Sequence, residues 1–131
     1  MIQETQKNPY KTRKHSQPEA RIQSSCVLWL NNERPETRGL YIHIPNEGNR
    51  DSAIDGALRR SLGLVAGAPD TFLFLARGDY HGLAVEFKTP TGVQSQAQKD
   101  FQFRLERQGY KYVICRSLEE FQQIIDDYLN L

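Results

Sequence analysis

The chain has 131 residues and a mass of 15.1 kDa, the size of one domain. Charged residues make up 25% of the chain and the mean hydropathy is −0.65. The densest apolar run covers only residues 26–30, so the sequence excludes a membrane-spanning helix. The first residues lack the apolar segment of a secretory signal, and two cysteines imply no disulfide framework. We therefore expect a small soluble protein of the reducing cytoplasm.

The net charge of +1 hides a gradient along the chain. Residues 1–16 carry four basic side chains against Glu4, whereas residues 118–131 carry four acidic side chains and no basic one. We interpret 1–16 as a flexible basic arm and 17–131 as the folded domain. Such an arm is either a contact for nucleic-acid phosphates or a solvated tail, and charge alone does not decide between them.

The folded part begins with a capping-box pattern at Ser16-Gln-Pro-Glu19, followed by apolar residues at helical spacing. A loop is expected over 31–39. The helical patterns cover 17–31, 52–62, 95–108 and 117–129. The strand patterns cover 40–44, 71–76, 82–88 and 111–115. The order α-β-α-β-β-α-β-α predicts an α/β fold in which helices flank a small mixed sheet of about four strands.

Three ionisable residues stand at the ends of the two central strands. Glu86 and Lys88 share one face of their strand because side chains alternate. If the connection is a five-residue hairpin turn at 77–81, Phe72 lies opposite Glu86 and Asp70 opposite Lys88. Two adjacent carboxylates favour a hard cation such as Mg²⁺, and a neighbouring lysine can orient or deprotonate a water. This set predicts metal-assisted phosphodiester hydrolysis; the alternative is a surface salt bridge of Lys88.

From residue 17 onward the chain resembles the VRR-NUC (virus-type replication-repair nuclease) branch of the PD-(D/E)xK nucleases. The resemblance rests on Gly67-Ala-Pro-Asp70, a hairpin, Glu86-Phe-Lys88 and Ser95-Gln-Ala-Gln98. It implies a restriction-endonuclease-like core that uses Mg²⁺ or Mn²⁺. It further implies that Asp70 and Glu86 bind the metal and that Lys88 is catalytic.

The same resemblance extends the site by three residues. The backbone carbonyl of Phe87 completes the metal site, Glu19 approaches the metal from the first helix, and Gln98 supports the site from the helix after the lysine strand. Glu19 is also the fourth residue of a capping box, and that role competes with the metal. Gln98 and Gln94 fit equally well as surface amides of their helix.

The resulting hypothesis is a divalent-metal-dependent endonuclease that uses a metal-bound water to cleave DNA. The sequence holds no base-reading motif, so we expect the enzyme to recognise DNA shape. Stand-alone members of the branch look like nucleases of branched DNA such as four-way (Holliday) junctions. This resemblance implies a homodimer and a phage or bacterial replication-repair setting. Residues 40–44 and the apolar residues of the first helix are candidates for the dimer surface. Two alternatives stay open: a nuclease of linear duplex DNA and a non-catalytic DNA-binding module.

Overall fold

The computed structural model describes residues 17–45 and 53–131. The predicted basic arm and the predicted start of the second helix at residue 52 therefore lie outside the described residues. The described helices are α1 (Gln17–Glu33), α2 (Ala53–Ser61), α3 (Gln96–Glu106) and α4 (Leu118–Leu129), with a 3₁₀ turn, η2 (Pro35–Thr37). The strands are β1 (Tyr41–His43), β2 (Thr71–Leu73), β3 (Leu83–Phe87) and β4 (Lys111–Cys115).

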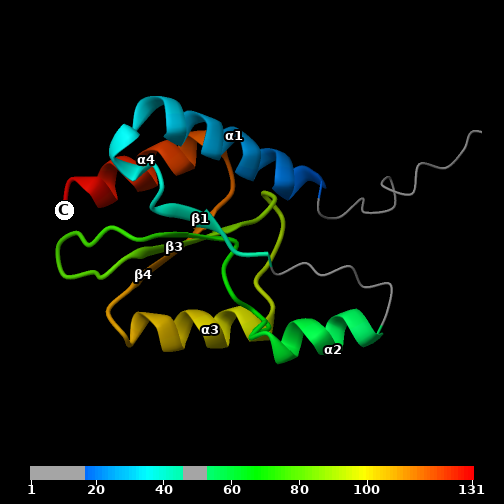
Figure 1. The fold of residues 1–131 in the computed structure, drawn as a ribbon. Coiled ribbons are helices and arrows are strands. Elements are labelled where there is room, and N and C mark those ends of the chain that lie inside the picture. The colour runs from blue at the N-terminus through cyan, green and yellow to red at the C-terminus, as the bar shows by residue number, and fades with distance from the viewer. Residues whose placement is uncertain (1–16, 46–52) are drawn as a thin grey trace, which may run out of the picture.

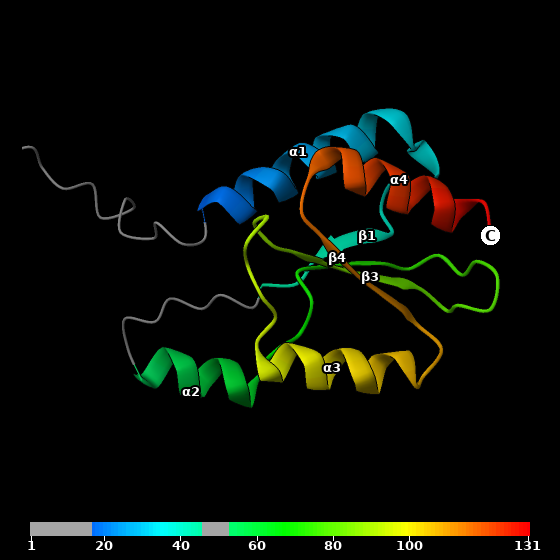
Figure 2. The ribbon, with the colours of Figure 1, turned by 180° about the vertical axis from the view of Figure 1, so that it is seen from behind.

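The four strands form one sheet in the order β1-β2-β3-β4. β1 pairs with β2 and β2 with β3 antiparallel, whereas β3 and β4 are parallel and are connected through α3. Helices α1 and α4 lie side by side on one face of this sheet, and α3 covers the other face (Figures 1 and 2). The predicted mixed sheet with flanking helices is confirmed.

Strand alternation divides the core into two layers. Leu83, Val85 and Phe87 are fully buried or nearly so and belong to the larger cluster, which includes residues of α1 and α4. Ala84 points to the opposite face with Tyr112, in the smaller cluster beside α3. Glu86 shares the face of Ala84, so its carboxylate is directed to the smaller layer.

The predicted register of the central hairpin is wrong by two residues. Phe72 pairs with Ala84 instead of Glu86, which brings Asp70, one residue before β2, level with Glu86 instead of Lys88. The connection is longer than a five-residue turn, because β2 ends at Leu73. Within this connection, Arg77 and Tyr80 form an isolated antiparallel β-bridge. A shift of two residues preserves the face of every side chain, so the acids still share one.

The predicted loop over 31–39 is also partly wrong. Helix α1 continues to Glu33, and the Arg34 N–H donates to the Leu30 carbonyl, which extends the helical bonding by one more residue. The 3₁₀ turn follows because the buried Thr37 hydroxyl donates to the Arg34 carbonyl at 2.8 Å.

Candidate active site

The candidate site forms where β2 begins and β3 ends, and the first element that positions it is the Gly67–Asp70 turn. Gly67 has φ of +84°, and a Cβ at this position would lie 2.3 Å from the carbonyl carbon and oxygen of Ala97 in α3. Only glycine fits that contact and that dihedral angle. Pro69 is fully buried, so the turn rests firmly on the start of α3 and directs Asp70 into the sheet.

Asp70 is fixed to the strand that carries the second acid. Its Oδ2 accepts a hydrogen bond from the Phe87 N–H at 2.7 Å, and its carbonyl accepts from the Ile44 N–H at 2.8 Å. Bonds from backbone N–H groups favour the charged form of a carboxyl group. The structure thus places the side chain of Asp70 next to the backbone of the residue that follows Glu86.

Glu86 is a buried carboxylate, with only 1% of its surface exposed. Its Oε2 accepts a hydrogen bond from Gln94 Nε2 at 3.2 Å, while its Oε1 has no hydrogen-bond partner. Tyr112 Oη is also buried without a hydrogen bond of standard geometry, although the phenol lies near enough to Glu86 to favour its charged form. A buried oxygen that carries charge and lacks a partner is costly, and such groups need an explanation.

The pKa of Glu86 is raised, chiefly by burial. The charge of Glu19 raises this pKa further, whereas Tyr112, the charge of Lys88 and the hydrogen bond from Gln94 lower it. The pKa of Tyr112 is raised as well, first by burial and then by the charge of Glu86, with a further contribution from Asp70. The charge of Lys88 therefore reaches Glu86, and the charge of Asp70 reaches the neighbouring Tyr112.

The described residues bring few possible metal ligands together. Within residues 17–45 and 53–131, no three His, Cys, Asp or Glu side chains lie close enough together to hold a metal ion. Glu19 thus acts on Glu86 through its charge without forming a three-carboxylate cluster. Mg²⁺ nevertheless requires only one or two protein carboxylates and completes its shell with waters and substrate phosphate. Asp70, Glu86 and the carbonyl of Phe87 fit that requirement, and the unpartnered Oε1 supplies an observation in favour of a cation.

The structure places Gln98 in the cap of α3 and Gln94 beside Glu86. Gln98 closes a capping box: its Oε1 accepts from the Ser95 N–H at 2.8 Å and its own N–H donates to Ser95 Oγ at 3.2 Å. Gln94 instead contacts Glu86 and also donates to Gln102 Oε1 at 2.9 Å. The Ser-x-x-Gln spacing contained the signal for the capping box, while no local signal identified Gln94.

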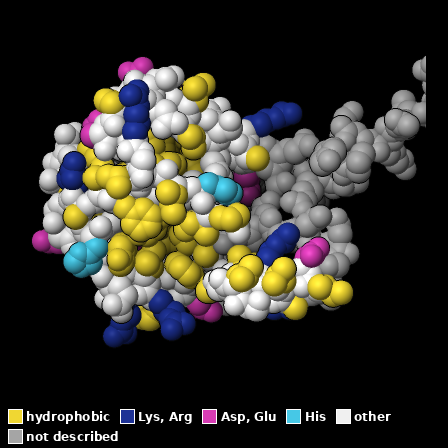
Figure 3. All heavy atoms as spheres, in the orientation of Figure 1, with side chains coloured by type: hydrophobic (Ala, Val, Ile, Leu, Met, Phe, Trp, Pro, Cys, Tyr) yellow, Lys and Arg dark blue, Asp and Glu magenta, His cyan; other side chains and the backbone are white. Residues whose placement is uncertain are grey.

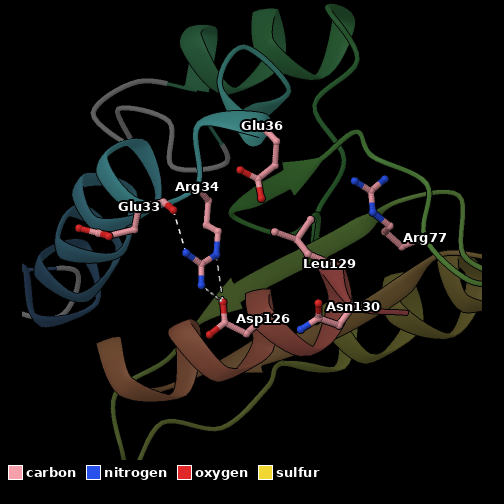
Figure 4. Close-up of a pocket in the computed structure, with 7 residues that line it drawn as sticks. All are labelled: Glu33, Arg34, Glu36, Arg77, Asp126, Leu129 and Asn130. Atoms are coloured by element: carbon pink, nitrogen blue, oxygen red, sulfur yellow. Dashed lines mark hydrogen bonds and ion pairs between the residues drawn. The ribbon is translucent and has the colours of Figure 1, made fainter.

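A separate cavity of about 410 Å³ lies near the opposite end of the sheet, where the chain passes from β2 to β3 (Figure 4). Its lining residues are Glu33, Arg34, Glu36, Arg77, Asp126, Leu129 and Asn130. Arg34 is engaged there in an ion pair with Asp126 and donates to the Glu33 carbonyl. None of the candidate site residues lines this cavity.

Comparisons with known proteins identify the family and the fold of the chain. The family model of the VRR-NUC domain matches residues 11–119, so the match begins within the segment interpreted as an arm. A solved structure described as a VRR_NUC domain protein aligns with a TM-score of 0.74 and 27% sequence identity, over 87% of this chain and 89% of that one. No curated protein matches the chain.

The fold and the comparisons define a nuclease-type domain with an α/β core. The chain belongs to the VRR-NUC family. None of the described helices has the length and apolar character of a membrane span.

Proposed function

We propose that the protein is a Mg²⁺- or Mn²⁺-dependent endonuclease that cleaves branched DNA such as four-way junctions. The observation that carries the proposal is the buried Glu86 carboxylate, with Oε1 unpartnered, next to Asp70 and within the electrostatic reach of Lys88. A bound cation would offset the cost of a negative charge on this buried carboxylate.

In this proposal each residue has one task. Asp70, Glu86 and the Phe87 carbonyl hold the cation, which when bound supplies Lewis-acid activation of the scissile phosphate and of water. Lys88 orients the attacking water and offsets the charge that develops on the phosphate. Glu19 adjusts the charge of the site from α1.

The two glutamines have supporting tasks in the same proposal. Gln94 orients Glu86 through the hydrogen bond that its amide donates. Gln98 fixes the first turn of α3, against which the Gly67 turn rests.

The experiment compares labelled linear, flapped and four-way DNA, with Mg²⁺ or Mn²⁺ and with chelator, for the natural chain and Lys88→Ala. Lys99→Ala is the matched control, because Lys99 is exposed on α3. Cleavage that requires the cation and falls about 10²- to 10⁴-fold in Lys88→Ala alone supports the proposal. Binding without cleavage under every cation would identify a binding module. Equal rates on linear and four-way DNA would remove the claim of branch specificity.

The proposal includes a homodimer whose surface keeps residues 40–44 from the sequence hypothesis and adds α2. The apolar face of α1 is occupied, since Cys26 and Leu30 are fully buried in the core. Leu28 is an exposed apolar side chain of α1. A larger group of exposed apolar side chains lies on and beside β1 and β2 and on α2: Leu40, Ile42, Phe74, Ile54, Leu58 and Leu62. Figure 3 shows hydrophobic side chains gathered on one face, over the strands and along the α2 side of the molecule.

A second copy of the chain fits this face for two reasons. Among the described residues β1 is the edge strand of the sheet and pairs with β2 alone, and such edges pair readily with an identical strand. A two-fold axis through this contact would relate two sites, as a symmetric junction requires. Light scattering on the natural chain should give a dimer mass, and Ile42→Lys combined with Leu58→Lys should give a monomer. A monomeric natural chain at micromolar concentration refutes this part alone.

A further inference from the structure

The turn that follows β3 lies against the side chain of Lys88. The Gly92 N–H donates to the Thr89 carbonyl at 3.1 Å and closes the turn. A Cβ on Gly92 would lie 3.5 Å from Lys88 Cδ and 3.1 Å from Thr89 Oγ1, so the lysine stem passes beside the turn with room for about one methyl group between them. The 89–92 turn therefore forms one wall of the space in which the Lys88 side chain lies.

Arg116 holds both ends of this turn. Its Nη1 donates to the carbonyls of Thr89 and Gly92, each at 2.7 Å. Arg116 follows β4 directly, and the Lys88 N–H donates to the Cys115 carbonyl at 3.0 Å. Because β3 and β4 are parallel, Lys88 and Arg116 both follow the carboxyl ends of their strands, at the same end of the sheet. Both side chains are half-buried, and charged donors bond carbonyl oxygens more strongly than neutral donors.

The same turn positions Gln94 beside Glu86. Gln94 stands two residues after Gly92, and its amide donates to Glu86 Oε2 at 3.2 Å. The Arg116 guanidinium therefore fixes a segment with two roles. The segment lies beside the Lys88 stem at its start, and through Gln94 it orients the buried Glu86 carboxylate at its end.

We propose that Arg116 is a positioning residue of the active site, which acts on Lys88 and Glu86 through the 89–92 turn and does not bind the substrate itself. This inference rests on the proposed function. Displacement of a catalytic group by about 1 Å lowers rates by up to about 10²-fold. We therefore expect Arg116→Ala to lower kcat about 10- to 100-fold while KM for DNA changes less than twofold.

The test is a double-mutant cycle of Arg116→Ala and Lys88→Ala, measured by nicking of supercoiled plasmid over hours so that slow variants remain measurable. In the Lys88→Ala background, Arg116→Ala should lower the rate clearly less than in the natural chain, because its largest effect passes through the missing lysine. Arg38→Ala is the control, since this exposed guanidinium donates to the Asn31 carbonyl far from the site. Arg116→Gln, which keeps one donor to the turn, should recover part of kcat.

Three results would overturn the inference. Independent, additive losses in the cycle mean that Arg116 does not act through Lys88. A tenfold weaker binding of DNA, with a salt dependence reduced by about one charge, identifies a direct phosphate contact instead. A loss of kcat that follows only a loss of folded protein, seen in the thermal melts of both Arg116 variants, identifies a structural role. Full cleavage by Lys88→Ala would instead refute the proposed function, which keeps the two failures distinct.

Discussion

Substitution of Glu86 by glutamine should stabilise the protein when no divalent cation is bound. The carboxylate is buried and its Oε1 has no hydrogen-bond partner, and an unsatisfied buried polar atom costs about 1–3 kcal/mol. Glutamine has the same shape, keeps an oxygen for the Gln94 donor and places an amide near the unpartnered hydroxyl of Tyr112. For a domain of this size, about 1–3 kcal/mol raises Tm by roughly 4–12 °C.

The gain depends on pH in a defined direction. The folded-state pKa of Glu86 is raised above the ordinary value of 4.5, so protonation favours the folded form. The cost of the charge is absent below the unfolded pKa and appears as the pH rises through the folded pKa. The difference between Glu86→Gln and the natural chain should therefore be largest at pH 7 and vanish near pH 4.

The assay is thermal unfolding followed by circular dichroism, in chelator and with Mg²⁺, with the exposed Glu36→Gln as control. A cation at 100 times its Kd stabilises the natural chain by about 2.7 kcal/mol, and Glu86→Gln should lose most of that gain. The variant is thus more stable without the cation and less responsive to it. A Tm of Glu86→Gln below that of the natural chain at pH 7 in chelator would show that the unpartnered oxygen does not destabilise the fold.

Three further outcomes follow from the structure. Gly67→Ala should cost at least about 2 kcal/mol in urea unfolding, because its Cβ would overlap α3, whereas Gly39→Ala, at φ of +79° with open space, should cost about 1–2 kcal/mol. Gln94→Leu should weaken Mn²⁺ binding about 10- to 100-fold in calorimetry, since it removes a donor to Glu86; unchanged affinity would contradict this role. The half-exposed Arg34–Asp126 ion pair should contribute no more than about 1 kcal/mol in a double-mutant cycle.

Local patterns predicted the elements well because they depend on neighbours in sequence. The strand at 111–115 has the predicted bounds, and both bounds of the final helix lie within one residue of those expected. The register of β2 and β3 was wrong because it depends on residues 74–82, whose path is decided by packing. Asp70 and Glu86 still lie on the same face of the sheet, because a register shift of two residues leaves every side chain on its face.

The supporting contacts could not be predicted for a different reason. Gln94 contacts Glu86 because the 89–92 turn reverses the chain direction. Arg116, which bonds the same turn, lies 24 residues after Gly92 in the sequence. No periodicity or spacing connects residues in this way. Gln98 shows the opposite case: its capping box is fully local and could have been recognised from the Ser95-x-x-Gln98 spacing.

The parallel pairing of β3 with β4 has a consequence for how the protein matures. Lys88 and Arg116 become neighbours only after the chain has made its crossover through α3, and such long-range pairings form late and slowly in folding. An incompletely folded or newly synthesised chain therefore lacks an ordered lysine. In the proposed mechanism DNA cleavage requires the completed crossover, so a chain that has not yet formed the β3–β4 pairing would not cleave DNA.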